Sequence, residues 1–522
     1  MMQKSTKWNF EIYLALILGI SLAVGAAMQG ILGVGRFLPG FVAAALLTFF
    51  GLFVMLLVWH KADGGKVMAW MMLAAFALRI ILSIFLIWGL PRFGYDNFDQ
   101  QAGFVFSDAY RRESTAWTLA KSDESLLAAF DDELGSDQYG GMLAMSALVY
   151  RTLSPDAFRP SLISIISATA MSLSIPILMS VVQKKFNRKT ALWTGWILAF
   201  YPDGVLLGAS QMREPLMILL ISVLIWATAH WLDRDRVKLA LSIFGLDLIL
   251  FLFLSYRVAI PSLGAIALWV WSVESGRIEK LWPKLIGWVV IALGGVASLA
   301  FFKPWLDQVL RWDAHLTILN SGMLTFLFER LPENLTFPFV LIYGLLQPVL
   351  PAALVTPAPW IWKGIGIFRA VGWYALAPLL IYAAVRVWKA DSQTKRRWLG
   401  AILVVVLAWL LIASARAGGD QWDNPRYRTI FLPWMAILGG WGVNYASRQK
   451  DPWFYRILGV EAVFLLVFTE WYLSRYLHFG PILEFEVIAG LIVGLSALIL
   501  AGGWVWDLVR RKKGASLKKD SD

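Results

Sequence analysis

Long uninterrupted runs of apolar residues dominate the chain, and polar residues collect between the runs rather than alternating within them. Each run has about 20 residues, the length that an α-helix needs to cross the hydrocarbon core of a bilayer. The pattern therefore predicts an all-α polytopic membrane protein with about 14 transmembrane helices. The expected spans are 10–32, 38–59, 67–89, 160–182, 190–206, 211–232, 237–254, 258–274, 284–302, 364–388, 398–416, 429–446, 455–474 and 485–508.

Lysine and arginine gather in every second connection between these runs. Examples are Lys184 and Lys185, Arg234 and Arg236, and Arg448 with its neighbours. Connections on the cytoplasmic side of a membrane carry such an excess of positive charge. We therefore expect a multi-pass protein of the bacterial inner (cytoplasmic) membrane, with both termini cytoplasmic.

Two apolar stretches, 139–153 and 337–355, break this alternation when they are counted as full crossings. The second contains Gln347, Pro348 and Pro351, which interrupt a helix. We interpret both stretches as re-entrant or interfacial helices that pack against protein.

The chain shows no convincing internal repeat, so a single membrane domain is expected. We divide it into an N-terminal helix pair (1–66), a membrane core (67–446), C-terminal transmembrane helices (447–510) and a basic cytoplasmic tail (511–522). The core includes a long outer loop, 90–138, which carries ten acidic and four basic residues and is expected to contain a helix.

The amino-acid composition excludes several classes of protein. Of the 522 residues, 59% are hydrophobic and 16% are charged, against about 25% charged in soluble domains. The net charge of +12 follows the predicted topology, so it gives no reason to expect a nucleic-acid partner. The 0 cysteines exclude thiolate chemistry, and the motifs of P-loop, Rossmann, zincin and serine-hydrolase proteins are missing.

Asp108 is the first candidate for chemistry. Ser107 is suited to cap a helix that places Asp108 in its first turn and Arg112 one turn later on the same face. A carboxylate at the boundary of water and lipid can act as a general base. The alternative is a capping aspartate in a solvated amphipathic helix.

Two predicted helix starts carry arginine on the outer side. One is Arg213-Glu214-Pro215, and the other is Asn424-Pro425-Arg426-Tyr427-Arg428. Free backbone N–H groups and a guanidinium would together bind an anion such as a phosphate. The alternative is that these residues anchor helix ends at the membrane surface. Arg257 and Arg416 add further positive charge to the same face.

Arg79 and Asp247 lie in the middle of apolar runs. Each costs at least about 2.5–3.5 kcal/mol when it faces lipid. We expect the two side chains to pair with each other, and a proton or substrate relay is the alternative.

Carboxylates and arginines on one outer face fit a reaction on a phosphate-bearing lipid. A carboxylate would activate the acceptor, and arginines would stabilise the charge on a departing phosphate. The outer carboxylates also leave room for a divalent metal, Mg²⁺ or Mn²⁺.

The chain resembles the glycosyltransferase C (GT-C) superfamily in a series of short motifs and in their order along the sequence. These membrane enzymes use polyprenyl-phosphate-linked sugars and include protein O-mannosyltransferases and aminoarabinose transferases. The resemblance covers about 67–443 and rests on ordered pieces. They are Ser107-Asp108-Ala109-Tyr110, Gln138-Tyr139-Gly140-Gly141-Met142, Phe200-Tyr201-Pro202, Arg213-Glu214-Pro215 and Arg426-Tyr427-Arg428 with Phe431-Leu432-Pro433.

The resemblance implies a GT-C-like fold and assigns roles to these residues. Asp108 would be the catalytic acidic residue of the first loop, with Asp96 or Asp99 as rivals, and Glu214 would be a second acidic site residue. The implied substrate-binding residues are Arg213, Arg257, Arg416, Arg426, Arg428, Tyr110 and Tyr427.

The implied reaction is an inverting transfer of a sugar from a polyprenyl-phosphate donor to a lipid, glycan or protein acceptor on the outer face. A polymerase or ligase of polyprenyl-pyrophosphate oligosaccharides would use a similar arginine-rich site. A flippase for lipid-linked oligosaccharides is the alternative from another class, and it predicts repeated halves around a charged central cavity.

Overall fold

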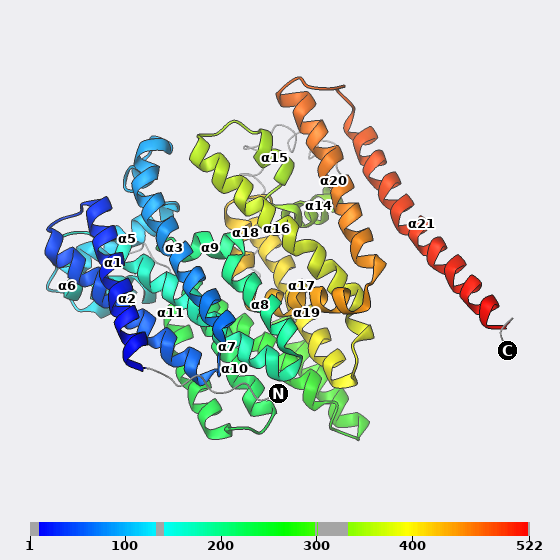
Figure 1. Cartoon of the computed structure of the whole chain (residues 1–522), viewed down its shortest axis with the longest axis horizontal. Helices are drawn as coiled ribbons and strands as arrows, with labels where there is room; N and C mark the ends of the chain where they lie inside the picture. Colours follow the sequence, from blue (N-terminus) through cyan, green and yellow to red (C-terminus); the bar gives the residue numbers. More distant parts are fainter. Residues whose placement is uncertain (1–9, 132–139, 298–299, 301–331, 520–522) are drawn as a thin grey trace.

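A computed structural model gives the structure of the chain and describes residues 10–131, 140–297, 300 and 332–519. These residues form helices joined by turns and short irregular segments, with no strand among them. Figure 1 shows the helices packed side by side as a bundle.

Ten helices in the described part of the chain are long and apolar enough to cross a membrane. This confirms the all-α, multi-pass class of fold. The long helices are α1 (Phe10–Leu32), α2 (Phe37–Lys61), α3 (Lys66–Phe93), α7 (Ser161–Lys185), α10 (Glu214–Leu232), α11 (Val237–Glu274), α16 (Trp360–Arg386), α17 (Gln393–Ala417), α20 (Pro452–Tyr476) and α21 (Phe485–Lys519).

Shorter helices fill the ends and flanks of the bundle. They are α4 (Phe98–Gln101), α5 (Ser107–Lys121), η1 (Leu126–Phe130), α6 (Gly141–Leu153), α8 (Arg188–Phe200), α9 (Pro202–Gly208), α14 (Glu333–Leu346), α15 (Leu350–Val355), η3 (Val387–Lys389), α18 (Asp423–Thr429) and α19 (Leu432–Gln449). A further apolar helix spans Leu281–Ala297.

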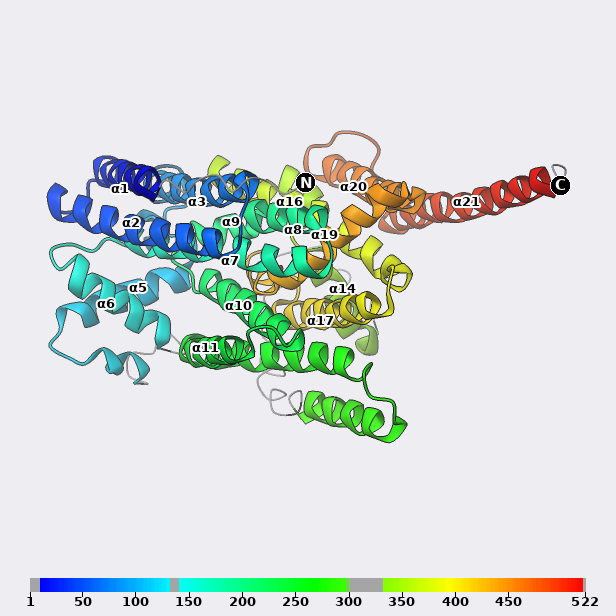
Figure 2. The ribbon, with the colours of Figure 1, turned by 60° about the horizontal axis from the view of Figure 1, so that its bottom comes forward.

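Helix α7 lies at the centre of the bundle, and α2, α3, α8 and α10 pack around it. Most of its side chains are buried, small serines and alanines included, which lets these neighbours approach closely. By contrast, α21 packs mainly on α20 and is largely exposed, and Figure 2 shows it reaching away from the bundle.

Some predicted spans differ in detail from the helices. The expected break between the runs 237–254 and 258–274 is found at Ser255, where helical geometry is interrupted within α11. The run 190–206 is split into α8 and α9, because the chain leaves the helical conformation at Tyr201 ahead of Pro202. The run 429–446 begins in the short α18 and continues as α19.

The two stretches interpreted as interfacial are too short for a crossing. Helix α6 has 13 residues, and the second stretch is divided into α14 and α15 by Gln347 and Pro348. These lengths agree with the interpretation.

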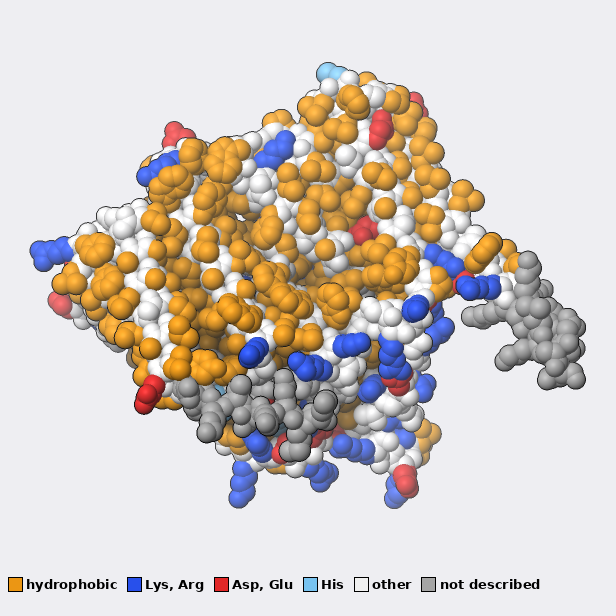
Figure 3. All heavy atoms as spheres, in the orientation of Figure 1, with side chains coloured by type: hydrophobic (Ala, Val, Ile, Leu, Met, Phe, Trp, Pro, Cys, Tyr) orange, Lys and Arg blue, Asp and Glu red, His pale blue; other side chains and the backbone are white. Residues whose placement is uncertain are grey.

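The basic connections meet at one end of the bundle. Lys185 forms an ion pair with Asp233, and Lys184 Nζ lies 2.9 Å from Asp235 Oδ2, so the end of α7 lies beside the end of α10. Figure 3 shows lysine and arginine gathered along the lower part of the molecule and apolar side chains above them.

The expected pair of Arg79 and Asp247 is not formed. Arg79 is fully buried and donates hydrogen bonds to the carbonyls of Ala75, Leu198 and Ala199. Asp247 lies on α11, and its Oδ2 has no hydrogen-bond partner among the described residues. Two of these acceptors, the Leu198 and Ala199 carbonyls, are among those that the end of α8 leaves free.

Removing Arg369 is expected to destabilise the bundle. Arg369 Nε on α16 lies 2.5 Å from Asp203 Oδ1 on α9, and both side chains are buried. The substitution Arg369→Met would leave the Asp203 carboxylate buried without its cation, at a cost of about 3–5 kcal/mol. Thermal unfolding of the purified protein in detergent measures the loss.

Arg448→Gln is the matched control, because the pair of Arg448 with Asp391 is largely exposed. Its cost is expected to stay below about 1 kcal/mol. Equal effects of the two substitutions would contradict the importance given to the buried pair.

Candidate functional site

Asp108 occupies the first turn of α5, as the sequence predicts. Its Oδ1 accepts a hydrogen bond of 3.0 Å from the Ala109 N–H. The expected cap by Ser107 is not formed, because the helix already includes Ser107 and the preceding Phe106 provides no side-chain cap. The carboxylate at the start of α5 is therefore held by the backbone of its own first turn.

Arg426, on the short helix α18, brings three carboxylates together. Its Nη1 lies 3.0 Å from Asp108 Oδ2 and 3.4 Å from Asp423 Oδ1. Its Nε lies 3.2 Å from Glu214 Oε1, at the first residue of α10. Arg426 and Glu214 are almost fully buried, whereas 37% of the Asp108 side chain and 44% of the Asp423 side chain are exposed.

The surroundings of Asp108 favour its ionised form. Burial by itself would raise the pKa of Asp108, but the charges of Arg426, Arg112 and Arg213 and the hydrogen bond from Ala109 outweigh this effect. The pKa of Asp108 therefore lies below its ordinary value, and the carboxylate is charged at neutral pH.

The pKa of Asp423 shifts in the opposite direction. Burial raises the pKa of Asp423, and the negative charges of Asp420 and Asp108 raise it further, while Arg426 and Arg416 act against them. Two carboxylates that approach the same nitrogen of Arg426 therefore differ in how readily they hold a proton.

A cavity of about 890 Å³ opens at this cluster. Most of the predicted site residues lie on its wall, and it also contains residues that the sequence did not single out for a role. The predicted residues on the wall are Asp99, Asp108, Arg213, Glu214, Arg257, Arg416, Arg426 and Tyr427. The cluster is therefore accessible to a ligand of considerable size.

Part of the cavity wall is apolar. It includes Phe337 and Leu341 of α14 and Leu411, Ile412 and Ala413 of α17. Aromatic residues, among them Trp362 and Trp422, also line the cavity. The wall thus combines charged groups with apolar and aromatic surface.

Three predicted site residues lie outside the cavity wall. Arg428 is 1% exposed, donates to the Gln347 carbonyl over 2.9 Å and packs its guanidinium on the Trp373 ring. Tyr110 packs edge-on against Phe104, and Asp96 is exposed and accepts a hydrogen bond from Gln101. The structure thus gives Arg428 a role in packing, and it does not bring Asp96 or Tyr110 to the cluster.

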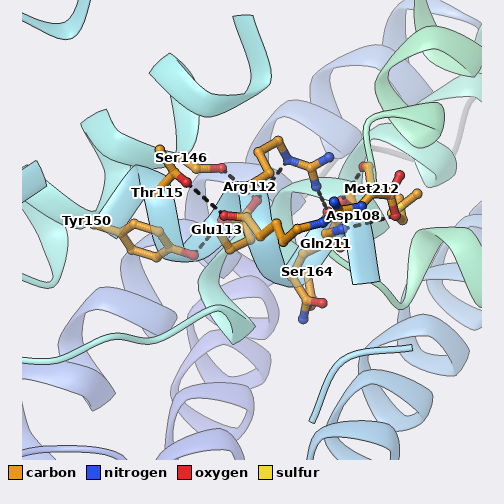
Figure 4. Close-up of polar contacts among 12 residues, drawn as sticks. Asp108, Arg112, Glu113, Thr115, Ser146, Tyr150, Ser164, Gln211 and Met212 are labelled. Carbon is orange, nitrogen blue, oxygen red and sulfur yellow. Dashed lines mark hydrogen bonds and ion pairs between the residues drawn. The ribbon is translucent and has the colours of Figure 1, made fainter. Parts of the chain in front are cut away.

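Glu113 forms a buried polar network that the sequence did not reveal. Its Oε1 accepts a hydrogen bond of 3.0 Å from Ser146 Oγ, and its Oε2 accepts one of 2.6 Å from Tyr150 OH. Arg112 Nε lies 3.3 Å from Glu113 Oε1. Figure 4 shows these side chains pointing toward one another between α5 and α6.

Arg112 connects this network to the start of α10. It donates a hydrogen bond to the Gln211 carbonyl, and Gln211 in turn donates to Ser164 Oγ over 2.9 Å. Gln211 lies three residues before Glu214. The network therefore fixes α5, which carries Asp108, relative to the segment that carries Glu214 (Figure 4).

The described residues contain no group of three or more His, Cys, Asp or Glu side chains arranged to hold a metal ion. Asp108, Glu214 and Asp423 all face Arg426, so a guanidinium stands where a metal bound by these three carboxylates would lie. The cluster as it stands does not fit the Mg²⁺ or Mn²⁺ ion for which the sequence leaves room.

Together, the helices and the cavity define a multi-pass helical membrane protein with a charged site at one end of its bundle. Comparison of the chain with protein-family models, with curated proteins and with solved structures gives no match. The function must therefore be argued from the site itself.

Tyr150→Phe tests the buried network. The substitution removes the donor to Glu113 Oε2 and leaves a buried carboxylate oxygen without that partner, which costs about 1–3 kcal/mol. Thermal unfolding in detergent is expected to show a lower midpoint. Tyr455→Phe, at a side chain that is 70% exposed, is the control and should leave the midpoint unchanged. A Tyr150→Phe protein as stable as the wild type would contradict the role of the network.

Proposed function

We propose that the protein is a membrane glycosyltransferase that moves a sugar from a polyprenyl-phosphate donor to an acceptor on the outer face of the cytoplasmic membrane. The observation that carries the proposal is the cluster of Asp108, Glu214 and Asp423 around Arg426 at the wall of a large cavity. The cluster provides an ionised carboxylate and fixed positive charge at one accessible place.

The charge of the cavity wall supports an anionic ligand. Among the described residues of the wall, six arginines stand against four acidic residues. They are Arg111, Arg112, Arg213, Arg257, Arg416 and Arg426 against Asp99, Asp108, Glu214 and Asp423. A guanidinium presents its donors in a fork that matches phosphate oxygens.

The apolar wall supports a ligand that also carries a lipid chain. Helix α17 is long and apolar enough to cross a membrane, and its apolar side chains line the cavity together with Arg416. A phosphate held by the arginines would therefore have hydrophobic surface beside it for its lipid.

The direction of the helices supports an outward-facing site. Helix α10 begins at Glu214 in the cluster and ends at Leu232, beside the basic connections. The excess of positive charge marks the cytoplasmic side of a membrane protein. The proposal therefore includes a cavity on the outer side, cytoplasmic termini and about 14 crossings.

The chemistry assigned to the cluster is a displacement at the sugar carbon that is bonded to the phosphate. The acceptor hydroxyl forms the new carbon–oxygen bond, the bond from the sugar to the phosphate oxygen breaks, and the lipid phosphate leaves with the electron pair. Asp108 would activate the acceptor hydroxyl, and Arg426 with its neighbouring arginines would stabilise the negative charge on the leaving phosphate. The acceptor class is a lipid, a glycan or a protein.

Asp108→Asn is expected to lower transfer by about 100-fold or more, because the neutral amide lacks the negative charge that activates the acceptor hydroxyl. The measurement is the transfer of radiolabelled sugar by the purified protein in liposomes, offered a panel of polyprenyl-phosphate sugars and crude membrane acceptors. Asp96→Asn is the matched control, because Asp96 lies in the same loop but outside the cavity wall. It is expected to keep wild-type activity.

Two results would overturn the proposal. One is a folded Asp108→Asn protein with full activity. The other is a wild-type protein that transfers no sugar and instead moves a lipid-linked oligosaccharide across the bilayer, which would favour the flippase. Transfer that proceeds only from polyprenyl-pyrophosphate oligosaccharides would favour the polymerase or ligase.

A further inference from the structure

Asp423 has no catalytic step of its own in the proposed reaction, although its carboxylate and that of Asp108 approach the same nitrogen of Arg426. Both carboxylates approach Arg426 Nη1, at 3.4 Å and 3.0 Å, and both line the cavity. Each side chain is more than one third exposed, so a ligand in the cavity can reach both. The two groups are therefore neighbours at the place where the reaction is proposed.

The two carboxylates differ in the hydrogen-bond donors near them. Asp108 accepts the Ala109 N–H and lies closer to Arg426 Nη1. At the start of α18, the N–H groups of Trp422 and Asp423 donate instead to Asp420 Oδ1, over 2.6 Å and 2.7 Å. The carboxylate of Asp423 thus approaches Arg426 at the longer distance, while Asp420 takes the backbone donors of its own segment.

We infer that Asp423 is a second catalytic carboxylate, which takes the proton of the acceptor hydroxyl while Asp108 stays ionised and orients that hydroxyl. This inference rests on the proposed glycosyl transfer and divides its acid–base work between two residues. As the acceptor oxygen bonds to the sugar carbon, its proton passes to an oxygen of Asp423, and the lipid phosphate departs with the electron pair. The protonated Asp423 then loses its proton to water in the cavity.

The charges that face Asp423 agree with this role. Arg426 lies on its own helix, Asp108 on α5, Arg416 on α17 and Asp420 in the preceding turn. Burial and the two negative neighbours raise the pKa of Asp423, whereas the arginines keep Asp108 charged. Pairs of carboxyl groups with opposite pKa shifts commonly divide the work of holding a charge and moving a proton.

The experiment compares Asp423→Asn and Asp423→Ala with the wild type in the same liposome assay. Asp423→Asn is expected to lower kcat by about 100-fold or more. In the wild type the rate should fall as the pH drops through the pKa of Asp423, which lies above the ordinary value for aspartate, because only the ionised form accepts a proton. This acid limb should be absent in Asp423→Asn.

Formate provides a readout that a purely structural role would not affect. In Asp423→Ala the side chain is missing from a partly exposed position, so added sodium formate can place a carboxylate there and should restore part of the activity. Asp420→Asn is the matched control, because Asp420 holds the start of α18 and lies outside the cavity wall. Formate should not change its rate.

Active wild-type protein together with an Asp423→Asn variant that keeps the full rate and the acid limb would overturn the assignment of Asp423 alone. A folded Asp423→Ala variant that formate leaves inactive would overturn it as well. Wild-type protein that transfers no sugar would instead overturn the proposed function, and the role of Asp423 with it.

Discussion

The buried guanidinium of Arg426 is the constraint on which the site depends. Arginine does not lose its proton in a protein, so a buried arginine needs negative charges or hydrogen-bond acceptors around it. Arg426 obtains them from α5, from the start of α10 and from its own helix α18. These segments lie far apart in the sequence. Their ion pairs with one cation hold the starts of three helices together at the wall of the cavity.

The buried arginines of this protein fall into two groups with different consequences. Arg79 and Arg428 donate to backbone carbonyls, and Arg369 pairs with one buried carboxylate. Such arginines close the ends of helices or join two helices, and none of the three lies on the cavity wall. Arg426 and the arginines around it lie where a ligand can approach, so the location of an arginine, rather than its presence, separates a structural role from a functional one.

The sequence predicted the long helices well, because a helix that crosses a bilayer needs a continuous apolar run of about 20 residues. The run 10–32 matches α1 (Phe10–Leu32) at both ends. The expected break between 254 and 258 is found at Ser255 in α11. A predicted boundary failed at Pro202, where proline starts a new helix inside an apolar run.

The site was predictable only in part. Asp108, Glu214 and Arg426 were found because helix starts carry local signals such as proline and acidic residues. Arg428 was placed in the same set, but residues two apart on a helix point about 200° apart, so one of the pair faces the cavity and the other packs on Trp373. The contact of Glu113 with Tyr150 joins two helices, and no spacing in the sequence indicates it.

Burial raises the pKa of both Asp108 and Asp423, but three arginines outweigh it at Asp108, while two negative neighbours add to it at Asp423. The starts of the two helices add to this difference. An acidic residue in a first turn is stabilised by the free N–H groups there, and Asp108 accepts such a bond from Ala109. Asp423 stands in the first turn of α18, but Asp420 accepts the N–H groups of Trp422 and Asp423. Asp420 also adds negative charge beside Asp423, so two chemically identical side chains acquire unequal proton affinities beside a single arginine.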